Sequence, residues 1–368
     1  MSSQSVVLRR LASQLLTGPK ASDPVAVARR LLAIQGQDPR GARLAIRVRS
    51  KGLSAKDVDR ALSEDRSLLI TWLNRGTLHL VASDDYPWLH ALTAPTLATA
   101  SARRLAQEGV TPDAADRGVA VIEGALADEG PLDRAQLRER IDKAGVRTQG
   151  QALVHLLLLA SLRGVAVRGP MVGAQHAYVL CRDWLGEQAR VDRDRALAEL
   201  ARRYLVGHAP ADDRDLAKWS GLPLRDVRAG LAAIAPELHH REDGLLELAS
   251  RAAGATAKTR GRSAGRRSTG GRSAAERSGL PAPRLMGAFD PLLLGWRSRA
   301  EFLEQSEPIV TVNGLFRPFA LVRARAVATW GLAGGEVTLK PFAPLAEGDE
   351  RALVKDAEGV VRFLWPAG

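Results

Sequence analysis

The sequence predicts an α+β fold in which tandem winged-helix modules precede a β-rich, barrel-like C-terminal domain. Three observations support this fold class. Groups of amphipathic helices are each followed by two short strand-like segments, and this order recurs up to residue 250. Residues 251–280 then contain almost no large apolar side chain. After them, short apolar stretches separated by Gly or Asn turns are typical of β-strands.

The first winged-helix module is expected at residues 1–83. Its helices are followed by strand-like segments at 67–73 and 77–81, and the turn Asn74-Arg75-Gly76 separates the two. Helices that are closed by such a hairpin form the pattern of a winged helix. Residues 84–116 follow as a helical connector.

Two further modules, at 117–185 and 190–250, repeat this order of elements with little sequence identity. In the third module, Pro223 begins a helix that carries Arg225 and Arg228 on adjacent turns. Such a helix can present its arginines to a DNA groove. A solvated basic face explains the same two residues equally well.

The C-terminal domain is expected at residues 281–368. A charged stretch at 346–356 is expected to be helical. We interpret the rest as a small barrel or curved sheet that closes the molecule. The strand-like runs lie at 309–312, 319–322, 326–330, 336–339 and 360–364.

The chain is strongly basic. Its formal net charge of +12 and its pI near 10.5 favour polyanionic partners, with nucleic acid ahead of an acidic membrane surface. Residues 251–279 contribute +7 of this charge, so the rest of the chain is only modestly basic. Their composition predicts a disordered, arginine-rich linker at 251–280, because it offers too little apolar surface to support a fold. Binding of DNA phosphates by this linker is an open alternative.

The sequence disfavours several classes of protein. Cys181 is the single cysteine, so we expect no intrachain disulfide and no cysteine-based zinc site. No apolar run approaches the length of a membrane span, and no secretory signal is recognisable near Met1. Phosphate-binding loops, paired dinucleotide glycines and nucleophile elbows are missing from the sequence. We therefore expect a monomeric, cytoplasmic, nucleoid-associated protein that has no cofactor, no metal and no membrane partner.

One polar stretch, Gln35-Gly36-Gln37-Asp38-Pro39, closes an expected amphipathic helix at residues 24–36. Glycine weakens a helix, and Pro39 disfavours helical geometry at the residue before it, so the helix should end here. The two neutral amides of Gln35 and Gln37 would then lie at the helix end. Taken alone, the stretch fits a solvated helix C-terminus.

This stretch and four others together resemble the winged-helix family of bacterial DNA glycosylases of the AlkZ/YcaQ type. The resemblance follows the order of the chain and covers nearly all of it except the arginine-rich linker. It implies tandem winged helices and a C-terminal β-domain arranged around DNA. Two positions depart from the family pattern: Gly36 replaces a larger apolar residue, and the turn at 321–325 lacks a glycine. The other four stretches are 71–80, 287–297, 312–318 and 329–330.

The resemblance implies that Gln35 and Gln37 are the glutamine pair that acts in cleavage of the N-glycosidic bond, as in the Gln-x-Gln branch of the family. Guanine alkylated at N7 is a cation and already a good leaving group, so it needs no strong general acid. An amide oxygen can accept a hydrogen bond from the attacking water and face developing positive charge. We expect Gln37 to position the water and Gln35 to orient it or stabilise the sugar, and the reverse assignment stays open.

The expected function is that of a DNA glycosylase that hydrolyses the N-glycosidic bond of cationic N7-alkylated purines in double-stranded DNA. Bulky adducts and interstrand crosslinks are further candidate substrates, in DNA repair or self-resistance. We expect a monofunctional enzyme, because the nearest upstream lysine to the glutamine pair is Lys20. One alternative is a non-catalytic winged-helix DNA-binding protein such as a transcriptional regulator. Another is a protein that binds small DNA-reactive molecules.

Further residues are assigned around the glutamine pair and along the DNA. Those expected to line the active site are Asp38, Arg75, Thr77, His79, Asp290 and Arg297. For Arg75, Thr77 and His79, which belong to the first hairpin, a structural role is an at least equal alternative. Those expected to bind DNA are Arg40, Arg43, Arg168, Gln175, His176, Arg225, Arg228 and Arg317. Arg168, Gln175 and His176 are included because they lie around the expected tip of the second hairpin, where a wing could meet a minor groove.

Overall fold

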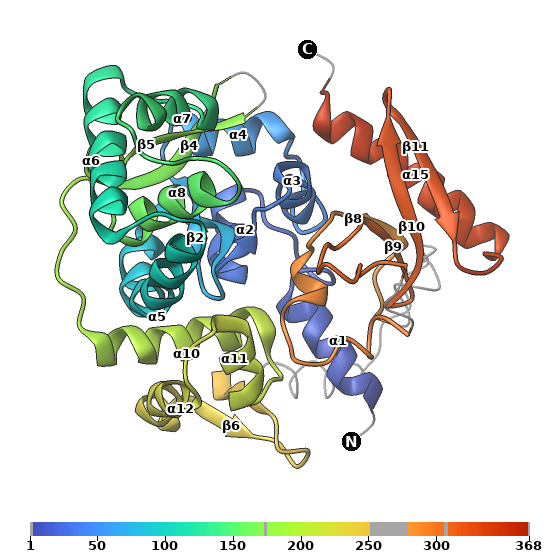
Figure 1. Cartoon of the computed structure of the whole chain (residues 1–368). Coiled ribbons are helices and arrows are strands. Elements are labelled where there is room, and N and C mark those ends of the chain that lie inside the picture. Colours follow the sequence, from blue (N-terminus) through green and yellow to red (C-terminus); the bar gives the residue numbers. More distant parts are fainter. Residues whose placement is uncertain (1–2, 173–174, 251–278, 305–307, 367–368) are drawn as a thin grey trace. The chain divides into compact units, whose positions relative to one another are not determined.

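The computed structural model describes residues 3–172, 175–250, 279–304 and 308–366 (Figure 1). About half of the chain is helical, and antiparallel sheets complete the expected α+β class. The chain divides into two compact units. The expected arginine-rich linker falls almost wholly outside the described residues. Unit 1 consists of Met1–Ala55, Leu197–Trp219 and Pro223–Gly368, and unit 2 of Lys56–Ala196 and Ser220–Leu222.

A sheet built from two hairpins organises unit 2. Strands β2 (Leu68–Leu73) and β3 (Thr77–Ala82) form the first hairpin, and β4 (Ala166–Val172) pairs with β5 (Gln175–Leu180) to form the second. Both hairpins were expected from the sequence. Strand β2 also pairs with β4, which gives the order β3-β2-β4-β5. The hairpins of the first two expected modules therefore share one sheet, and the division into separate winged-helix modules stays a prediction.

Helices cover this sheet in unit 2. Helix α8 is apolar on all sides, and a helix of that composition has to be buried. It packs against α5 and α6, where Leu156 is fully buried. Helix α7 begins with a capping box between Asp133 and Gln136, in which each side chain bonds to the backbone of the other residue. The helices of this region are α4 (Ala55–Ser63), η1 (Ser83–Asp85), α5 (Tyr86–Gln107), α6 (Pro112–Glu129), α7 (Arg134–Lys143), α8 (Ala152–Leu162) and α9 (Cys181–Leu185).

Unit 1 combines three separate parts of the chain. Its N-terminal part holds α1 (Ser3–Ser13), α2 (Pro24–Leu31), the short strand β1 (Ile34–Gln35) and α3 (Pro39–Arg47). Helix α10, which falls mostly in this unit, α11 and α12 form a further group with the small hairpin β6–β7. The elements of that group are α10 (Arg193–His208), α11 (Asp213–Ser220), α12 (Leu224–Ala233), η2 (Ala235–Glu237), β6 (Leu238–His240) and β7 (Leu246–Leu248).

The C-terminal part of unit 1 is an open sheet. Four antiparallel strands lie in the order β11-β10-β9-β8, with β8 and β11 at its two edges. The expected barrel is therefore wrong, because the two edge strands do not pair with each other. Three expected strands, at 319–322, 326–330 and 336–339, are confirmed. The elements are β8 (Arg284–Met286), η3 (Pro291–Leu293), β9 (Phe319–Val322), β10 (Arg325–Ala333), β11 (Glu336–Pro341) and α15 (Glu347–Leu364).

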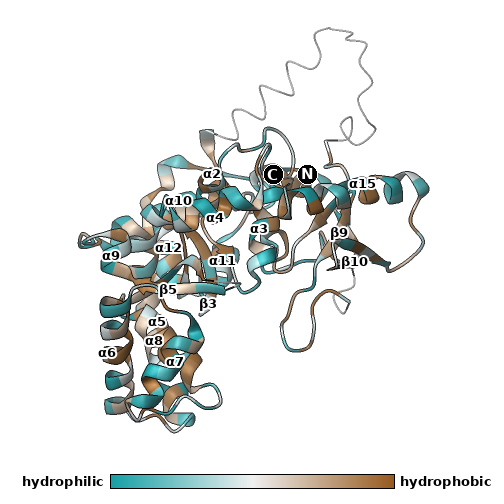
Figure 2. Ribbon diagram, turned by 90° about the horizontal axis from the view of Figure 1, so that it is seen from above, coloured by the Kyte–Doolittle hydropathy of each residue, from teal (hydrophilic) through white to brown (hydrophobic). Residues whose placement is uncertain are grey.

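Two of the expected C-terminal strands are wrong as well. Residues 360–364 belong to α15, which packs against β8. The buried positions Leu353, Asp356, Val360 and Phe363 follow helical spacing, whereas the β-rich composition of the last turn suggested a strand. Residues 309–312 contribute only an isolated bridge between Val310 and Phe316. Helix α15 carries both hydrophilic and hydrophobic residues along its length, as an amphipathic surface helix should (Figure 2).

A search of the described residues for a helix long and apolar enough to cross a membrane finds none.

Candidate active site

The glutamine stretch lies on an extended segment between two helices. Helix α2 ends at Leu31, five residues before the expected end, because Leu32 has a positive φ of 68°, which a helix cannot accommodate. Leu32 is fully buried, so tertiary packing supports this unfavourable backbone geometry. Ile34 and Gln35 then form β1. Residues two apart on an extended chain point to the same side, which brings the side chains of Gln35 and Gln37 together.

The two glutamine side chains are directly hydrogen-bonded. Nε2 of Gln35 donates to Oε1 of Gln37 over 2.5 Å. Gln35 is 7% exposed, whereas Gln37 is exposed to solvent. A carbonyl oxygen has two lone pairs, so Oε1 of Gln37 can accept a second hydrogen bond. The buried amide thus holds an exposed amide whose oxygen and nitrogen remain accessible to a ligand.

Asp38 begins helix α3 rather than ending a helix. Its Oδ1 accepts hydrogen bonds from the backbone N–H groups of Arg40 and Gly41, at 2.9 and 3.0 Å. Pro39 occupies the first helical turn, where its missing N–H costs nothing. Oδ2 of Asp38 has no hydrogen-bond partner within the described part of the chain, so one carboxylate oxygen stays available beside the glutamine pair.

A second motif of the sequence, at 287–297, packs against the start of α3. The contact is made by backbone: a Cβ added to Gly41 would lie 2.4 Å from the carbonyl oxygen of Ala288. A Cβ added to Gly287 would lie 2.7 Å from the carbonyl oxygen of Gly41. Only glycine permits so close an approach on both sides. The helix that follows the glutamine pair is therefore fixed by a segment about 250 residues later in the chain.

Asp290 forms a buried ion pair with Arg49. Both side chains are fully buried, and the two guanidinium nitrogens of Arg49 reach the two carboxylate oxygens at 2.7 and 2.8 Å. Arg49 also donates to Ala45 O and Gln14 Oε1. Asp290 in turn caps η3 by accepting from the N–H of Leu292. These contacts give Asp290 a structural role, and its place in the active-site lining stays a prediction.

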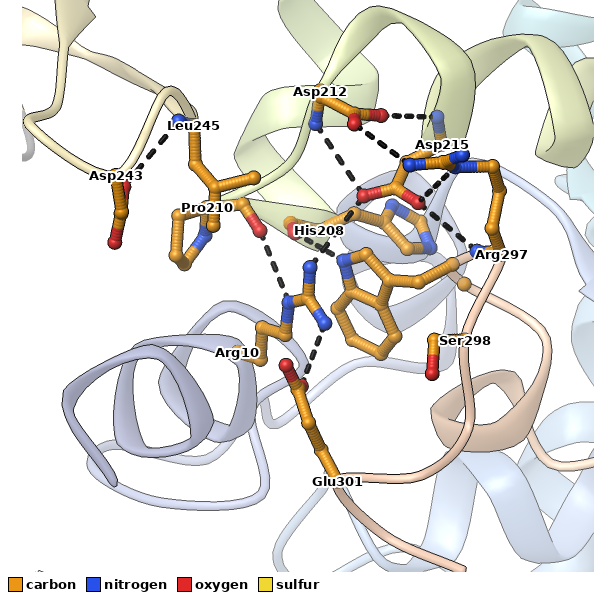
Figure 3. A network of polar contacts seen from close by, with 12 residues as sticks. Arg10, His208, Pro210, Asp212, Asp215, Asp243, Leu245, Arg297, Ser298 and Glu301 are labelled. Carbon is orange, nitrogen blue, oxygen red and sulfur yellow. Dashed lines mark hydrogen bonds and ion pairs between the residues drawn. The ribbon is translucent and has the colours of Figure 1, made fainter. Parts of the chain in front are cut away.

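Arg297 belongs to a polar network that Figure 3 shows from close by. Its backbone N–H donates to Asp215, and its guanidinium pairs with Asp212 at 3.0 Å. Arg10 approaches the same Asp215 from α1, pairs with Glu301 at 2.6 Å and lies 4.6 Å from the centre of the Trp296 ring. The network joins α1, α11 and the C-terminal motif, so Arg297 holds segments of unit 1 together. Its role in lining the active site stays a prediction.

Arg75, Thr77 and His79 lie on the first hairpin, in unit 2, so their expected placement beside the glutamine pair stays a prediction. His79 is buried, and its Nδ1 bonds to Thr77 O at 2.8 Å. Burial, and secondarily the charge of Arg75, lower the pKa of His79 to about 3, so its imidazole is neutral at neutral pH. Oγ1 of Thr77 is buried without a hydrogen-bond partner among the described residues.

Three expected DNA-binding residues lie in unit 1 around the glutamine stretch or the C-terminal sheet. Arg40 is exposed at the start of α3 and reaches Leu332 O of β10 at 3.5 Å. Arg317 is exposed and lines a hollow of about 660 Å³ with Leu332 and Lys340. Arg43 is buried and donates to Pro39 O at 2.8 Å. Arg40 and Arg317 are thus accessible to a polyanion, whereas Arg43 supports the first turn of α3.

The second hairpin differs from expectation at Arg168. Strand β4 continues past Gly169-Pro170 through an irregularity in register between Arg168 and Met171, so Arg168 lies within the strand rather than around a tip. Its guanidinium lies over the rings of Trp72 and Tyr178, at 4.9 and 4.6 Å from their centres. Packing on two aromatic rings explains why a basic residue occupies this strand.

The other two residues of this hairpin differ in exposure. Gln175 is exposed at the start of β5, whereas His176 is buried and bonds through Nδ1 to Gly169 O at 3.1 Å. On α12, the side chains of Arg225 and Arg228 are 86% and 60% exposed, and Arg228 pairs with Asp213 at 2.7 Å. Exposure makes Gln175, Arg225 and Arg228 accessible to DNA. Binding of DNA by all these residues stays a prediction.

Sequence analysis missed the residues that hold the site in place. Arg49 and Gln14 were not singled out, although both contact the Asp290 ion pair. The available signal was Asp290 itself, because a carboxylate within the apolar run at 288–294 requires a buried cation. No grouping of three or more His, Cys, Asp or Glu side chains that could hold a metal occurs in the described ranges.

Comparisons with known proteins agree with one another. A family model described as DNA glycosylase AlkZ-like matches residues 28–363. A Streptomyces sahachiroi protein named "Interstrand DNA cross-link repair glycosylase" is 27% identical over 360 residues, which cover 94% of this chain and 91% of that protein. The solved structure of Streptomyces sahachiroi DNA glycosylase AlkZ aligns with a TM-score of 0.73 and 23% identity, over 98% of this chain and 96% of that one.

Proposed function

Because this chain belongs to the AlkZ-like DNA glycosylase family, we propose that it hydrolyses the N-glycosidic bond of cationic N7-alkylated purines in double-stranded DNA. The observation that carries this proposal is the hydrogen bond between the side-chain amides of Gln35 and Gln37. The assignment of the chain to the Gln-x-Gln branch is part of the same proposal. Damaged DNA is the partner that the family implies.

Gln37 is the group that positions the water. Its Oε1 accepts one hydrogen bond from Gln35 and has a second lone pair for a water O–H. Donation by the buried Gln35 amide fixes the direction of the Gln37 carbonyl and polarises it. The water oxygen then attacks C1′ of the damaged nucleotide, and the displaced proton passes to solvent.

The leaving purine needs no protonation. The bond between C1′ and N9 breaks with its electron pair moving to N9, which neutralises the positive charge that N7 alkylation placed on the ring. Positive charge develops on the sugar instead, where the Oε1 dipole of Gln35 and the free Oδ2 of Asp38 stabilise it. This sharing of roles explains why neutral amides replace the paired carboxylates of ordinary glycosidases.

The proposed substrates include bulky adducts and interstrand crosslinks. The Streptomyces sahachiroi relative carries the name of a cross-link repair glycosylase, and this chain aligns with 91% of its length. A crosslinked purine is alkylated and cationic in the same way as a methylated one, so the same attack on C1′ releases it from the sugar.

Base release from duplex DNA that contains N7-methylguanine tests the proposal. We expect release by the native protein, and a loss of at least about 100-fold in rate for Gln37→Ala, because one positioned catalytic group typically contributes 10²–10⁴-fold. Gln35→Ala should reduce release as well, since Gln37 loses the donor that orients it. DNA affinity is measured in parallel at fixed salt concentration, because phosphate contacts make it salt-dependent.

The matched control is Gln107→Ala, which removes an exposed glutamine at the end of α5. It should leave both base release and DNA affinity unchanged. Failure of the native protein to release N7-methylguanine or a bulkier N7 adduct would contradict the proposal. So would equal release rates for native protein and Gln37→Ala.

A second candidate function is non-catalytic DNA binding. The exposed Arg225 and Arg228 on α12 favour it, because a helix with accessible arginines can enter a major groove. This function predicts sequence-specific binding that is lost in an Arg225→Ala/Arg228→Ala variant, together with an absence of base release.

A further inference from the structure

Unit 1 contains a basic pocket with a volume of about 480 Å³. It is formed by the C-terminal end of α3, the turn at 50–53, the first residue of β8 and the last turns of α15. Sequence analysis assigned no role to this region except the comment on Lys20. The charged residues that line the pocket are Lys20, Arg47, Lys51, Arg284, Asp356 and Arg362.

The single carboxylate of the pocket is already fully engaged. Oδ1 of Asp356 accepts from Arg47 at 2.7 Å and from Arg284 at 3.2 Å. Oδ2 accepts from Arg47 at 3.1 Å and from the backbone N–H of Leu285 at 2.8 Å. Asp356 is 6% exposed, so water contributes little to this balance. One carboxylate therefore faces five basic side chains, and the pocket carries an excess of positive charge.

Three cations keep hydrogen-bond donors for a ligand. Lys51 is exposed, and its side chain has no hydrogen-bond or ion-pair partner within the described residues. The side chain of Arg362 is 70% exposed, and its ion pair with Glu358 at 3.6 Å is exposed on both sides and therefore weak. Lys20 donates to the carbonyl oxygens of Leu15 and Val48. An ammonium group has three donors, so one of them remains.

The protonated form of Lys20 is destabilised within this pocket. Burial, followed by the charges of Arg49 and Arg284, lowers the pKa of Lys20 to about 7. A bound anion would oppose both causes, because it replaces lost solvation and supplies a countercharge.

The backbone of α15 leaves room for the contact between Arg47 and Asp356. A Cβ on Gly359 would lie 2.7 Å from Nη2 of Arg47, so glycine at this position of α15 lets the guanidinium reach Asp356.

We propose that the pocket between α3, β8 and α15 is a phosphate-binding site that takes a backbone phosphate of DNA. Excess positive charge, two exposed cations and a concave surface are the features that bind phosphate groups, in which lysine acts as a point charge and arginine as a fork. The DNA assignment rests on the proposed function, because a DNA glycosylase must hold the duplex around its catalytic residues. Free phosphate and nucleotides share the same chemistry and are distinguished by the test.

The test measures binding of the full chain to undamaged duplex DNA over a range of salt concentrations. Log K falls as log salt rises. Lys51→Gln and Arg362→Gln should each make this negative slope shallower by about 0.9, since each loses one phosphate contact. This change in slope corresponds to roughly eightfold weaker DNA binding at 0.1 M salt. Both side chains are exposed, so both variants should fold. The matched control is Arg351→Gln, which removes an exposed arginine of α15 outside the pocket.

Equal slopes for the native protein, Lys51→Gln and Arg362→Gln would overturn the proposal. Calorimetric titration with inorganic phosphate and with deoxyadenosine monophosphate separates the sources. Binding of these small anions by the native protein but not by the pocket variants, together with unchanged slopes for DNA, would also overturn the DNA assignment. A smaller slope in the pocket variants supports the site.

Base release distinguishes this proposal from the glycosylase proposal. If the native protein releases the base and the slopes of log K against log salt are equal in all variants, the phosphate-site proposal alone is contradicted. Reduced slopes in the pocket variants without any base release would support the phosphate site and contradict the glycosylase proposal.

Discussion

The two units differ in the burial of their ion pairs: several pairs of unit 1 are buried, although others of that unit lie at the surface. Unit 1 buries ion pairs: Arg49 and Asp290 are both fully buried, and the side chains of Arg241 and Glu247 are 1% and 4% exposed. In unit 2, ten ion pairs each have at least one partner that is 40% or more exposed, as in the pair of Arg182 and Glu123. Its interior is built from apolar residues around α8 instead.

Two of the ion pairs of unit 1 join segments that lie far apart in the sequence. Arg49 and Asp290 are separated by 241 residues, and Arg10 and Glu301 by 291. Apolar contacts are non-directional and accept many arrangements. A buried ion pair is strongly unfavourable unless both partners meet, so it penalises a wrong arrangement of segments. Unit 1 brings three distant parts of the chain together, and we infer that its buried pairs specify which of them meet.

The largest expected effect is the loss of one partner of the Arg49 ion pair. Asp290→Ala leaves the guanidinium buried without a countercharge and should lower the free energy of unfolding by about 3–5 kcal/mol. Urea unfolding measures this change, and amide hydrogen exchange should locate it in α3 and η3. The double variant Arg49→Met/Asp290→Leu should recover most of the stability, because it removes both charges. If the double variant is as unstable as Asp290→Ala, the ion pair itself stabilises the fold. The loss in the single variant would then not come from an unpaired buried guanidinium.

The corresponding change in unit 2 is apolar. Leu156 is fully buried in α8 and lies against Gly118 of α6, where an added Cβ would be 3.0 Å from its Cδ2. Leu156→Ala should lower the free energy of unfolding by roughly 3 kcal/mol, since it removes buried methyl groups and leaves a cavity. Leu156→Met should cost much less, because it conserves volume. Hydrogen exchange that increased in α3 rather than in α6 and α8 would contradict the separation of the two units.

Much of the local structure could be predicted from the sequence, and the exceptions arise where tertiary packing or an ambiguous local signal decides the structure. The hairpin β2–β3 was predicted because its strands and its turn at Asn74-Arg75-Gly76 are specified within a few residues. The end of α2 was misplaced because the positive φ of Leu32 depends on tertiary packing. Asp38-Pro39 was interpreted as the end of a helix, whereas Asp38 caps the start of α3, because a proline fits both just after a helix and in its first turn.

The candidate site shows the same limit. The motifs that contain Gln35 and Asp290 could be recognised separately. Their contact could not be predicted, because it depends on Gly41 and Gly287 meeting across most of the chain. Arg49 was missed for the same reason. Its partner, Asp290, lies 241 residues away in the sequence, so no local pattern identifies it.

Acid stability offers a further comparison, because unit 1 also buries a neutral imidazole. His208 is fully buried beside Tyr204 and Trp296, and burial lowers its pKa to about 3. Between this value and the ordinary value of 6.5, the unfolded chain binds a proton that the folded chain does not. Stability should therefore fall as pH decreases below about 6.5, by about 2 kcal/mol for this group at pH 5.

The variant His208→Gln tests this acid sensitivity. Urea unfolding at pH 7 and pH 5 should show a smaller loss of stability in His208→Gln than in the native protein, because glutamine does not titrate. The exposed His240 provides the control, and His240→Gln should retain the native pH dependence. An equal pH dependence for His208→Gln and the native protein would show that the buried imidazole is not the acid-sensitive group.

The smallest effect is expected at the surface of unit 2. Arg182 and Glu123 lie 2.6 Å apart, but their side chains are 58% and 41% exposed. Water solvates both charges in the absence of the pair, so Glu123→Gln should change the free energy of unfolding by less than about 1 kcal/mol. Urea unfolding at low and high salt measures it, and added salt should reduce even this small difference. A loss as large as that of Asp290→Ala would mean that burial does not separate the two kinds of ion pair. The contrast between the units would then need another explanation.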